Sequence, residues 1–408
     1  MSISDQQLYS LIEQETERQS NTLSLIASEN YPSEEVLKPL GSILSAKYAE
    51  GYPGARYYAG NEIVDQIEEL ARSRAKALFG AEHANVQPYS GSPANAAVYL
   101  GLLEFGDKIM GMSLPHGGHL THGHKVTFSG KAYQSVSYKV GADGLIDYEA
   151  LEKLAQEEKP KLIISGASAY PRAIDFERIG AIAKSVGAMH MADISHIAGL
   201  VAAGLHQNPV PYADVVTTTT HKTLRGPRAA IILCRSELAK QIDRAVFPGL
   251  QGGPHLNAIA GVAVALHEAA QLDFKDYIQK VIDNARALSA ALVQKGFTVL
   301  TGGTDNHLLV IDLQNKEVSG AEAETALELV GIVVNKNTIP NDPRKPMDPS
   351  GVRLGAAAVT TRGATTEDMK KIAQWITVAI DGRGDQAVLE AIKLDVRELA
   401  QKLPVPGL

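Results

Sequence analysis

The clearest structural signal lies in AMHMADISHIAGLVAAGLHQNPVPYADVVTTTTHK, residues 188–222. Two short apolar runs, at 188–193 and 214–220, are separated by a segment with a helical pattern. A strand, a helix and a second strand in this order are typical of neighbouring parallel strands with a crossover helix. The segment therefore predicts the centre of an α/β domain.

The same alternation continues on both sides, from about residue 80 to residue 240. Further strand candidates are KIMGM (108–112), KLIISG (161–166) and AIILC (230–234). They predict a mainly parallel sheet sandwiched by helices. After Gly253 come long helical segments and the strand candidates FTVL, HLLVIDL and GIVVN, which indicate a smaller α+β domain. We expect an N-terminal helical arm at 1–30, a large domain at 31–275 and a small C-terminal domain at 276–408.

Composition excludes several classes of protein. The 408 residues carry 39 basic and 46 acidic side chains, a net charge of −7 without a long basic block, which argues against nucleic acid as the main partner. The single cysteine, Cys234, cannot form an intrachain disulfide, and a reducing compartment fits best. The first residues lack the basic-then-apolar pattern of a signal peptide, and the longest apolar run is too short for a bilayer. We expect a soluble cytoplasmic protein.

Polar side chains directly follow two strand candidates, where ligands bind in open α/β sheets. Asp193 ends the first run; an acid there faces a bound cation, caps the next helix or is solvated in a loop. Lys222 follows the threonine-rich run, where burial would favour a neutral, nucleophilic amine, although a surface lysine is the simpler interpretation. Both side chains can lie at the same end of the sheet.

Two further segments suggest ligand contacts. Ser90-Gly91-Ser92-Pro93 leads into an apolar helix, so backbone N–H groups there can hold a phosphate, although any capped helix looks similar. The segment is neither a P-loop nor GxGxxG. Arg353 lies in a strand-like apolar setting, where its guanidinium suits a substrate carboxylate or a structural ion pair.

Four histidines crowd the segment PHGGHLTHGH, residues 115–124. A metal site is one interpretation. The segment contains no acid, however, and we expect no metal; turn histidines with one aromatic face against a ligand are the better interpretation. The four are His116, His119, His122 and His124.

One cofactor would use all of these features. Pyridoxal phosphate needs a lysine for covalent attachment, an acid on its ring nitrogen and a phosphate-binding site, and its amino-acid substrates need a group that binds their carboxylate. The sequence offers a candidate for each, so the combination is compatible with this cofactor.

Seven strings of the chain resemble the serine hydroxymethyltransferase family, in the family's order and across nearly the whole chain. They are LIASENYPS (25–33), KYAEGYPGARYYAG (47–60), GGHLTHG (117–123), VVTTTTHKTLRGPR (215–228), VFPGLQGGP (246–254), GGTDNH (302–307) and VNKNTIPND (334–342). The family has the fold of type I pyridoxal phosphate enzymes and works as a dimer or a pair of dimers. It interconverts serine and tetrahydrofolate with glycine and 5,10-methylenetetrahydrofolate.

The resemblance implies a role for each matching residue. Lys222 would hold the cofactor covalently, Asp193 would bind its ring nitrogen and His119 would stack on its ring. Phosphate contacts would come from Gly91, Ser92 and His221 and, across a subunit boundary, from Tyr48 and Gly253. Ser168 and His196 would flank the phenolic oxygen of the cofactor.

The substrate-binding residues follow from the same resemblance. Arg353, helped by Ser28, would bind the amino-acid carboxylate, and Glu50 and Tyr58 of the other subunit would contact the hydroxymethyl group. We expect Glu50 to transfer the hydroxyl proton. Folate would lie near Glu50, Tyr57, Leu114, Gly118 and Asn337. The implied partners are therefore small molecules and a second copy of the chain.

Some positions depart from the family pattern. They are Ala59 for glycine, Ile194-Ser195 for Met-Ala, Ala229-Ala230 for two glycines and Ala356-Ala357 for Thr-Pro. None removes a catalytic group, but they leave open the preferred amino acid. One alternative is a folate-independent threonine, allo-threonine or α-methylserine aldolase on the same scaffold. Others are a binding protein without turnover and a nicotinamide dehydrogenase, the last disfavoured because no glycine fingerprint follows a strand.

Overall fold

The computed structural model describes residues 5–407, which form two compact units. One unit spans residues 32–279, and the other combines residues 1–31 with 280–408. The division at 30 and 275 expected from the sequence stays a prediction. Within residues 5–407 no helix combines the length and the apolar character needed to cross a membrane.

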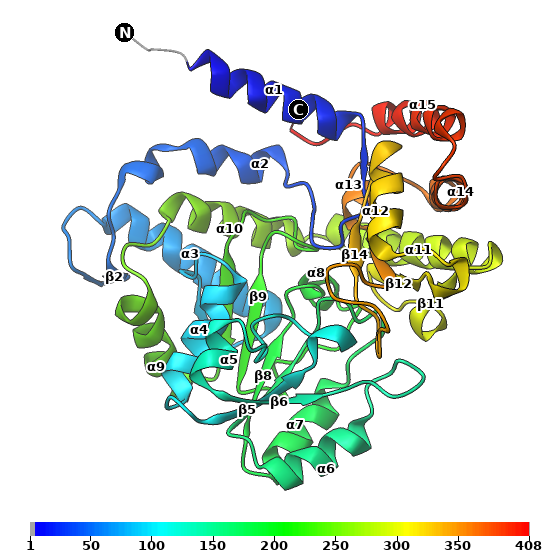
Figure 1. Ribbon diagram of the computed structural model, residues 1–408. Coiled ribbons are helices and arrows are strands. Elements are labelled where there is room, and N and C mark those ends of the chain that lie inside the picture. Colours follow the sequence, from blue (N-terminus) through cyan, green and yellow to red (C-terminus); the bar gives the residue numbers. More distant parts are fainter. Residues whose placement is uncertain (1–4, 408) are drawn as a thin grey trace. The chain divides into compact units, whose positions relative to one another are not determined.

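A seven-stranded sheet forms the centre of the unit at 32–279 (Figure 1). Its strand order is β4-β10-β9-β8-β7-β5-β6, and β10 alone runs antiparallel to its neighbours. The mainly parallel sheet predicted from the sequence is thus confirmed. The strands are β4 (His83–Asn85), β5 (Lys108–Met112), β6 (Gln134–Tyr138), β7 (Leu162–Ser165), β8 (Met189–Asp193), β9 (Val215–Thr219) and β10 (Ala230–Cys234).

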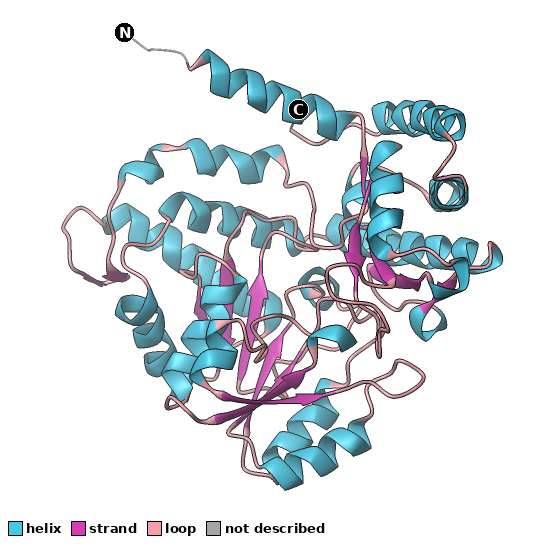
Figure 2. Cartoon of the chain, viewed as in Figure 1, coloured by secondary structure: helices cyan, strands magenta, loops and turns pink. Residues whose placement is uncertain are grey.

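Helices cover both faces of this sheet (Figure 2), as its alternating side chains require. Met191 on β8 packs in one apolar cluster with residues of α4 and α9, whereas its neighbour His190 points to the other face, which α7 covers. The helices of this unit are α2 (Glu34–Leu37), α3 (Glu62–Phe79), α4 (Gly91–Leu102), α5 (Phe128–Ala132), α6 (Tyr148–Glu158), α7 (Phe176–Ser185), α8 (Ala198–Ala202), α9 (Ala239–Arg244) and α10 (Leu256–Ala269). A hairpin of β2 (Gly51–Tyr52) and β3 (Ala55–Arg56) stands apart from the sheet.

The other unit is built on a four-stranded antiparallel sheet in the order β11-β12-β15-β14. Its strands are β11 (Thr298–Val299), β12 (Leu308–Asp312), β14 (Asn335–Asn337) and β15 (Gly351–Gly355), with a separate parallel pair of β1 (Leu23–Ser24) and β13 (Ile332–Val333). The pair ties the N-terminal segment into this unit. Its helices are α1 (Gln6–Ser20), α12 (Gly320–Leu329), α13 (Ala357–Thr361), α14 (Thr366–Asp381) and α15 (Gln386–Lys402), and α11 (Leu272–Gln294) enters it at residue 280.

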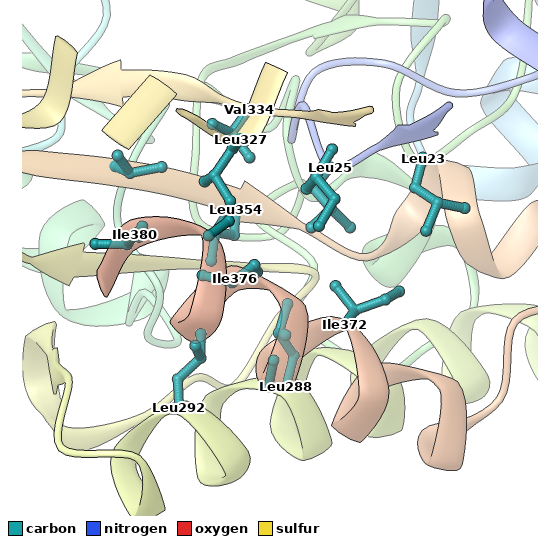
Figure 3. Packing of buried hydrophobic residues seen from close by; sticks show 14 of the residues in the cluster. Leu23, Leu25, Leu288, Leu292, Leu327, Val334, Leu354, Ile372, Ile376 and Ile380 are labelled. Atoms are coloured by element: carbon teal, nitrogen blue, oxygen red, sulfur yellow. The ribbon is translucent and has the colours of Figure 1, made fainter. Parts of the chain in front are cut away.

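One apolar core holds the second unit together (Figure 3). Leu354 of β15 packs with Leu288 of α11 and Ile376 of α14, and Leu25 beyond β1 joins the same cluster. All four residues are fully buried, so the burial of their apolar surface is a main source of the unit's stability. α14 begins with a capping box in which Thr365 and Asp368 bond each other's backbone N–H groups.

A buried histidine in the large sheet makes stability depend on pH. The Nε2 atom of His190 accepts a hydrogen bond from the Ser165 hydroxyl at 2.8 Å, and Nδ1 donates to the Tyr212 carbonyl at 3.1 Å. Burial lowers the pKa of His190 from 6.5 to about 4. Between these values the unfolded chain takes up a proton that the folded chain does not, so stability is lost as the pH falls from 6.5 to 4.

We therefore predict that His190→Gln flattens this pH dependence. Glutamine keeps one donor and one acceptor but does not titrate. Between pH 6.5 and 4, the free energy of unfolding of the original protein should fall by about 3 kcal/mol more than that of the variant. Urea unfolding at a series of pH values measures both curves. Parallel curves would show that His190 is not the group responsible.

Candidate active site

The predicted cofactor-binding residues lie at the carboxyl ends of strands. Asp193 is the last residue of β8, and Lys222 follows β9 by three residues. His119 lies in the segment after β5, Ser168 in the segment after β7 and Gly91 in the segment after β4. Because β4, β5, β7, β8 and β9 run in the same direction, these segments meet at one edge of the sheet.

The Asp193 carboxylate is held by several hydrogen bonds. Its Oδ2 atom accepts hydrogen bonds from Asn95 Nδ2 at 2.9 Å and His122 Nε2 at 3.0 Å, and Oδ1 accepts from the Ser195 backbone N–H at 3.0 Å. The residue is 8% exposed. Three donors thus fill three of roughly four lone-pair positions of a buried carboxylate.

The surroundings keep Asp193 ionised. Burial by itself would raise the pKa of Asp193, but the hydrogen bond and charge of His122 outweigh burial and hold this pKa well below its ordinary value. The residue is therefore a permanent negative charge at the sheet edge. Such a group suits a protonated ring nitrogen.

Lys222 lies in a loop whose backbone is fixed on both sides. The Thr220 hydroxyl donates to the Pro227 carbonyl at 2.6 Å, and the Thr223 hydroxyl donates to the His196 carbonyl at 3.0 Å. Arg225, which has a left-handed φ of 55°, closes the turn by donating its N–H to the Lys222 carbonyl. Lys222 is 9% exposed, so its amine is largely removed from water. The second of these bonds also places the backbone of His196 next to the loop.

The start of α4 provides a place for a phosphate. Its N-cap, Ser90, makes no capping hydrogen bond with its side chain, so the first N–H groups of the helix are not satisfied in that way. A Cβ atom on Gly91 would come within 2.7 Å of Thr219 Cγ2, which explains why glycine stands there, and Ser92 follows in the first turn. Both were predicted from the sequence to bind phosphate.

His221, the third predicted phosphate ligand at these strand ends, has a neutral ring. Burial, together with the charges of Lys222 and Arg228, lowers the pKa of His221 to about 3. Its Nδ1 atom is buried and has no hydrogen-bond partner among residues 5–407. A buried polar atom without a partner is costly, so a bound group that donates to or accepts from this atom would relieve that cost.

Three predicted residues gather in the segments after β5 and β7. Leu114 starts a short 3-10 helix, and the Gly117 carbonyl accepts a hydrogen bond from the Ser168 N–H at 2.7 Å. Gly118 must be glycine, because a Cβ atom there would lie 2.0 Å from the Met112 carbonyl oxygen. The loop that carries His119 is therefore held tightly against the end of β5.

A second group forms around the β2–β3 hairpin. The rings of Tyr48 and Tyr58 meet edge to face at 5.3 Å, and a Cβ atom on Gly253 would lie 3.0 Å from the Tyr48 ring. Arg56 donates to the carbonyls of Ala49 and Gly51, on either side of Glu50, at 2.8 Å each. The guanidinium thus fixes the backbone that presents Glu50. Tyr57 is largely exposed.

The predicted carboxylate-binding residues belong to the unit that contains β15. Arg353 lies on β15, pairs with Asn335 of β14 and donates from Nε to its side-chain oxygen at 3.1 Å. Desolvation lowers the pKa of Arg353 to about 10, so the guanidinium stays charged at neutral pH. Asn337 ends β14 on the same sheet.

Ser28 lies in the chain segment that packs on the end of β15. The Gly355 N–H donates to the Leu25 carbonyl at 2.7 Å, and a Cβ atom on Gly355 would lie 2.4 Å from Ala27 Cα. The segment that carries Ser28 therefore contacts β15 at Gly355, which lies two residues after Arg353. The pairing of these two residues implied by the sequence is thus compatible with the fold of this unit.

The sequence analysis did not identify three residues that make hydrogen bonds to the predicted site residues. Thr121 was noted only within the string GGHLTHG and Ser195 only as a departure from the family pattern, whereas Asn95 was not singled out. Ser195, one of the departures from the family pattern, donates to Asp193 and accepts from the Thr219 N–H at 3.1 Å. His122 was considered for a metal, but its ring bonds Asp193. Among residues 5–407, no three histidine, cysteine or acidic side chains come together in a way that could hold a metal ion.

Of the other departures, Ala59 is exposed, whereas Ile194 and the four alanines at 229–230 and 356–357 are buried. Ala229 precedes β10 and Ala230 begins it, and Ala356 and Ala357 lie at the start of α13. The structure shows no catalytic contact that these alanines would remove.

Taken together, these features fit pyridoxal phosphate. A buried lysine, an ionised and buried carboxylate, and a helix start together with a buried histidine nitrogen that has no partner among the described residues supply the three kinds of group that this cofactor needs. They all come from the unit at 32–279.

Comparison with known proteins gives an independent result. A family profile described as serine hydroxymethyltransferase matches residues 1–376. A protein of that name from Desulfotalea psychrophila is 55% identical over 404 residues, which make up 99% of this chain and 95% of the relative. One from Acidobacterium capsulatum is 54% identical over 405 residues, with the same two coverages of 99% and 95%.

Proposed function

The chain belongs to the serine hydroxymethyltransferase family, and from this premise we propose which residues carry out its reaction. The protein is a pyridoxal phosphate-dependent enzyme of fold type I. It transfers the hydroxymethyl group of serine reversibly to tetrahydrofolate, which gives glycine and 5,10-methylenetetrahydrofolate. We further propose that it acts in the cytoplasm, in keeping with its single cysteine.

The buried Asp193 carboxylate is the observation that carries the assignment of the site. When bound, pyridoxal phosphate withdraws electrons from the α-carbon of an amino acid and so weakens the bond to the hydroxymethyl carbon. Asp193 would keep a proton on the ring nitrogen, Lys222 would attach the cofactor and His119 would contact its ring. Gly91, Ser92 and His221 would bind the phosphate, while Ser168 and His196 would bind the phenolic oxygen.

The remaining predicted residues bind the amino acid and folate. Arg353, with Ser28, binds the substrate carboxylate through its charged guanidinium. Glu50 transfers the proton of the serine hydroxyl, and Tyr58 contacts the same hydroxymethyl group. Folate contacts Tyr57, Leu114, Gly118 and Asn337. The Arg56 bonds on either side of Glu50 support this role, because proton transfer needs a carboxylate held in a fixed place.

We propose that the active unit is a homodimer in which Tyr48, Glu50, Tyr58 and Gly253 serve the neighbouring subunit. Large apolar side chains are exposed along the segment that carries three of these residues, including Ile43 at 84% and Ile63 at 67%. Exposed apolar surface of this kind is typical of protein interfaces. Leu8, Leu11 and Ile12 of α1 are exposed as well.

Mixed dimers test this sharing of sites. Lys222→Ala and Glu50→Gln should each be nearly inactive alone, because each removes one required group from both sites. After unfolding and refolding together, half of the dimers are mixed, and each mixed dimer has one site with both groups intact. Activity should return to about a quarter of that of the unmodified protein.

The control is the same mixing of Lys222→Ala with a Lys222→Ala, Glu50→Gln double variant, which leaves no intact site and should stay inactive. If Glu50 serves its own subunit, the first mixture stays inactive too. That result would overturn the proposed exchange of residues between subunits.

A further inference from the structure

Asn95 is a buried polar residue in the otherwise apolar helix α4. Its side chain lies one turn after the predicted phosphate site, and the residue is 1% exposed. Asparagine is a weaker helix former than the alanines around it, and a buried amide must find partners for its donors and acceptor. Helix formation therefore does not explain an amide at this position, whereas its hydrogen bonds do.

The hydrogen bonds fix the orientation of the Asn95 amide. An ionised carboxylate can only accept, so the amide nitrogen must face Asp193, where Nδ2 donates to Oδ2 at 2.9 Å. The same nitrogen donates to Thr121 Oγ1 at 2.8 Å. The amide oxygen accepts from the Thr217 hydroxyl on β9 at 2.7 Å. All the hydrogen-bonding groups of the amide are therefore engaged.

Thr121 continues this series of hydrogen bonds from Asn95 to His119. Its oxygen already accepts from Asn95, and it lies 2.7 Å from His119 Nδ1. The Thr121 backbone N–H also donates to His119 Nδ1, at 3.2 Å. A nitrogen that accepts from a backbone N–H carries no proton, so the Thr121 hydroxyl must donate to it. This places the ring proton of a neutral His119 on Nε2.

We propose that Asn95 is a positioning residue, which orients Asp193 and His119 together for the reaction. Its amide is the one described group that bonds both the carboxylate and the hydroxyl that fixes the His119 ring. This inference rests on the proposed roles of Asp193 and His119. Because α4 also begins with the proposed phosphate site, the same helix carries that site and the amide that bonds Asp193.

Isosteric variants test the proposal. Asn95→Asp keeps the shape but replaces the donor with an oxygen that repels Asp193. Thr121→Val keeps the shape but removes the hydroxyl that bonds both Asn95 and His119, and leaves the bond between Asn95 and Asp193 in place. Thr121→Ser restores the hydroxyl. Asn284→Asp is the matched control, because Asn284 is equally buried and its amide donates to Thr360 Oγ1 and the Ala364 carbonyl, each at 2.8 Å, in the other unit.

The measurements are kcat and KM for serine, the dissociation constant of pyridoxal phosphate and the visible absorbance maximum of the bound cofactor. In Asn95→Asp we expect kcat to fall about 100-fold with KM within about threefold, weaker cofactor binding and a shifted absorbance maximum. Thr121→Val should lower kcat about tenfold, and Thr121→Ser should recover most of it. Asn284→Asp should lose thermal stability only.

Two outcomes would overturn the proposal. One is an Asn95→Asp protein that loses stability like the Asn284→Asp control but keeps its kcat and absorbance maximum. The other is equal kcat in Thr121→Val and Thr121→Ser. If the unmodified protein takes up no pyridoxal phosphate on Lys222, the proposed function fails instead, so the two failures can be told apart.

Discussion

Replacing Asp193 with asparagine should lower kcat for serine cleavage by about three orders of magnitude, or about 4 kcal/mol in the barrier. Asparagine has the same size but no charge, so it cannot hold a proton on the ring nitrogen of the cofactor. The loss should appear in kcat rather than in KM for serine, because Asp193 is not among the groups proposed to bind the substrate. Steady-state kinetics with saturating cofactor measure both.

Asp243→Asn is a closely matched control. Asp243 also accepts from a histidine and an asparagine, since its Oδ1 atom lies 2.9 Å from His83 Nε2 and 2.8 Å from Asn85 Nδ2. It should lose stability but keep kcat within about threefold, because it contacts none of the proposed cofactor ligands. An Asp193→Asn protein with nearly normal kcat would remove the carboxylate from the mechanism.

Lys222→Ala should have an equally large effect by a different route. Without the amine the cofactor can bind only by noncovalent contacts, so its release on dialysis should become much faster and kcat should fall about 1,000-fold or more. The Lys108→Ala control removes a lysine at the amino-terminal end of β5, whereas the site lies at the carboxyl ends of the strands. It should change neither the rate of cofactor release nor kcat. Retention of cofactor through dialysis by Lys222→Ala, at a normal rate of turnover, would show that another group holds it.

Most of the large sheet could be predicted from the sequence because its central strands are buried on both faces. Strands of this kind appear as continuous apolar runs, and AIILC and KIMGM coincide with β10 and β5. The strand β6 was missed because its sequence, QSVSY, is polar and mostly exposed at the sheet edge. The short β4 was missed because three residues give no periodicity.

The site was predictable only in part, and for a physical reason. Asp193 and Lys222 are visible because a position directly after a buried strand has a meaning in this class of fold. Asn95 carries a weaker signal, an amide in an apolar helix, and its partner lies 98 residues away. Which hydrogen bond a buried amide makes depends on tertiary contacts that local sequence patterns do not contain.

The attachment of pyridoxal phosphate to Lys222 is tested most directly by trapping. The unmodified protein is incubated with the cofactor, reduced with borohydride and digested, and its peptides are analysed by mass spectrometry. We predict a pyridoxyl-phosphate adduct on Lys222 in the peptide that follows β9. An adduct on other lysines only, or none at all, would contradict the proposed site.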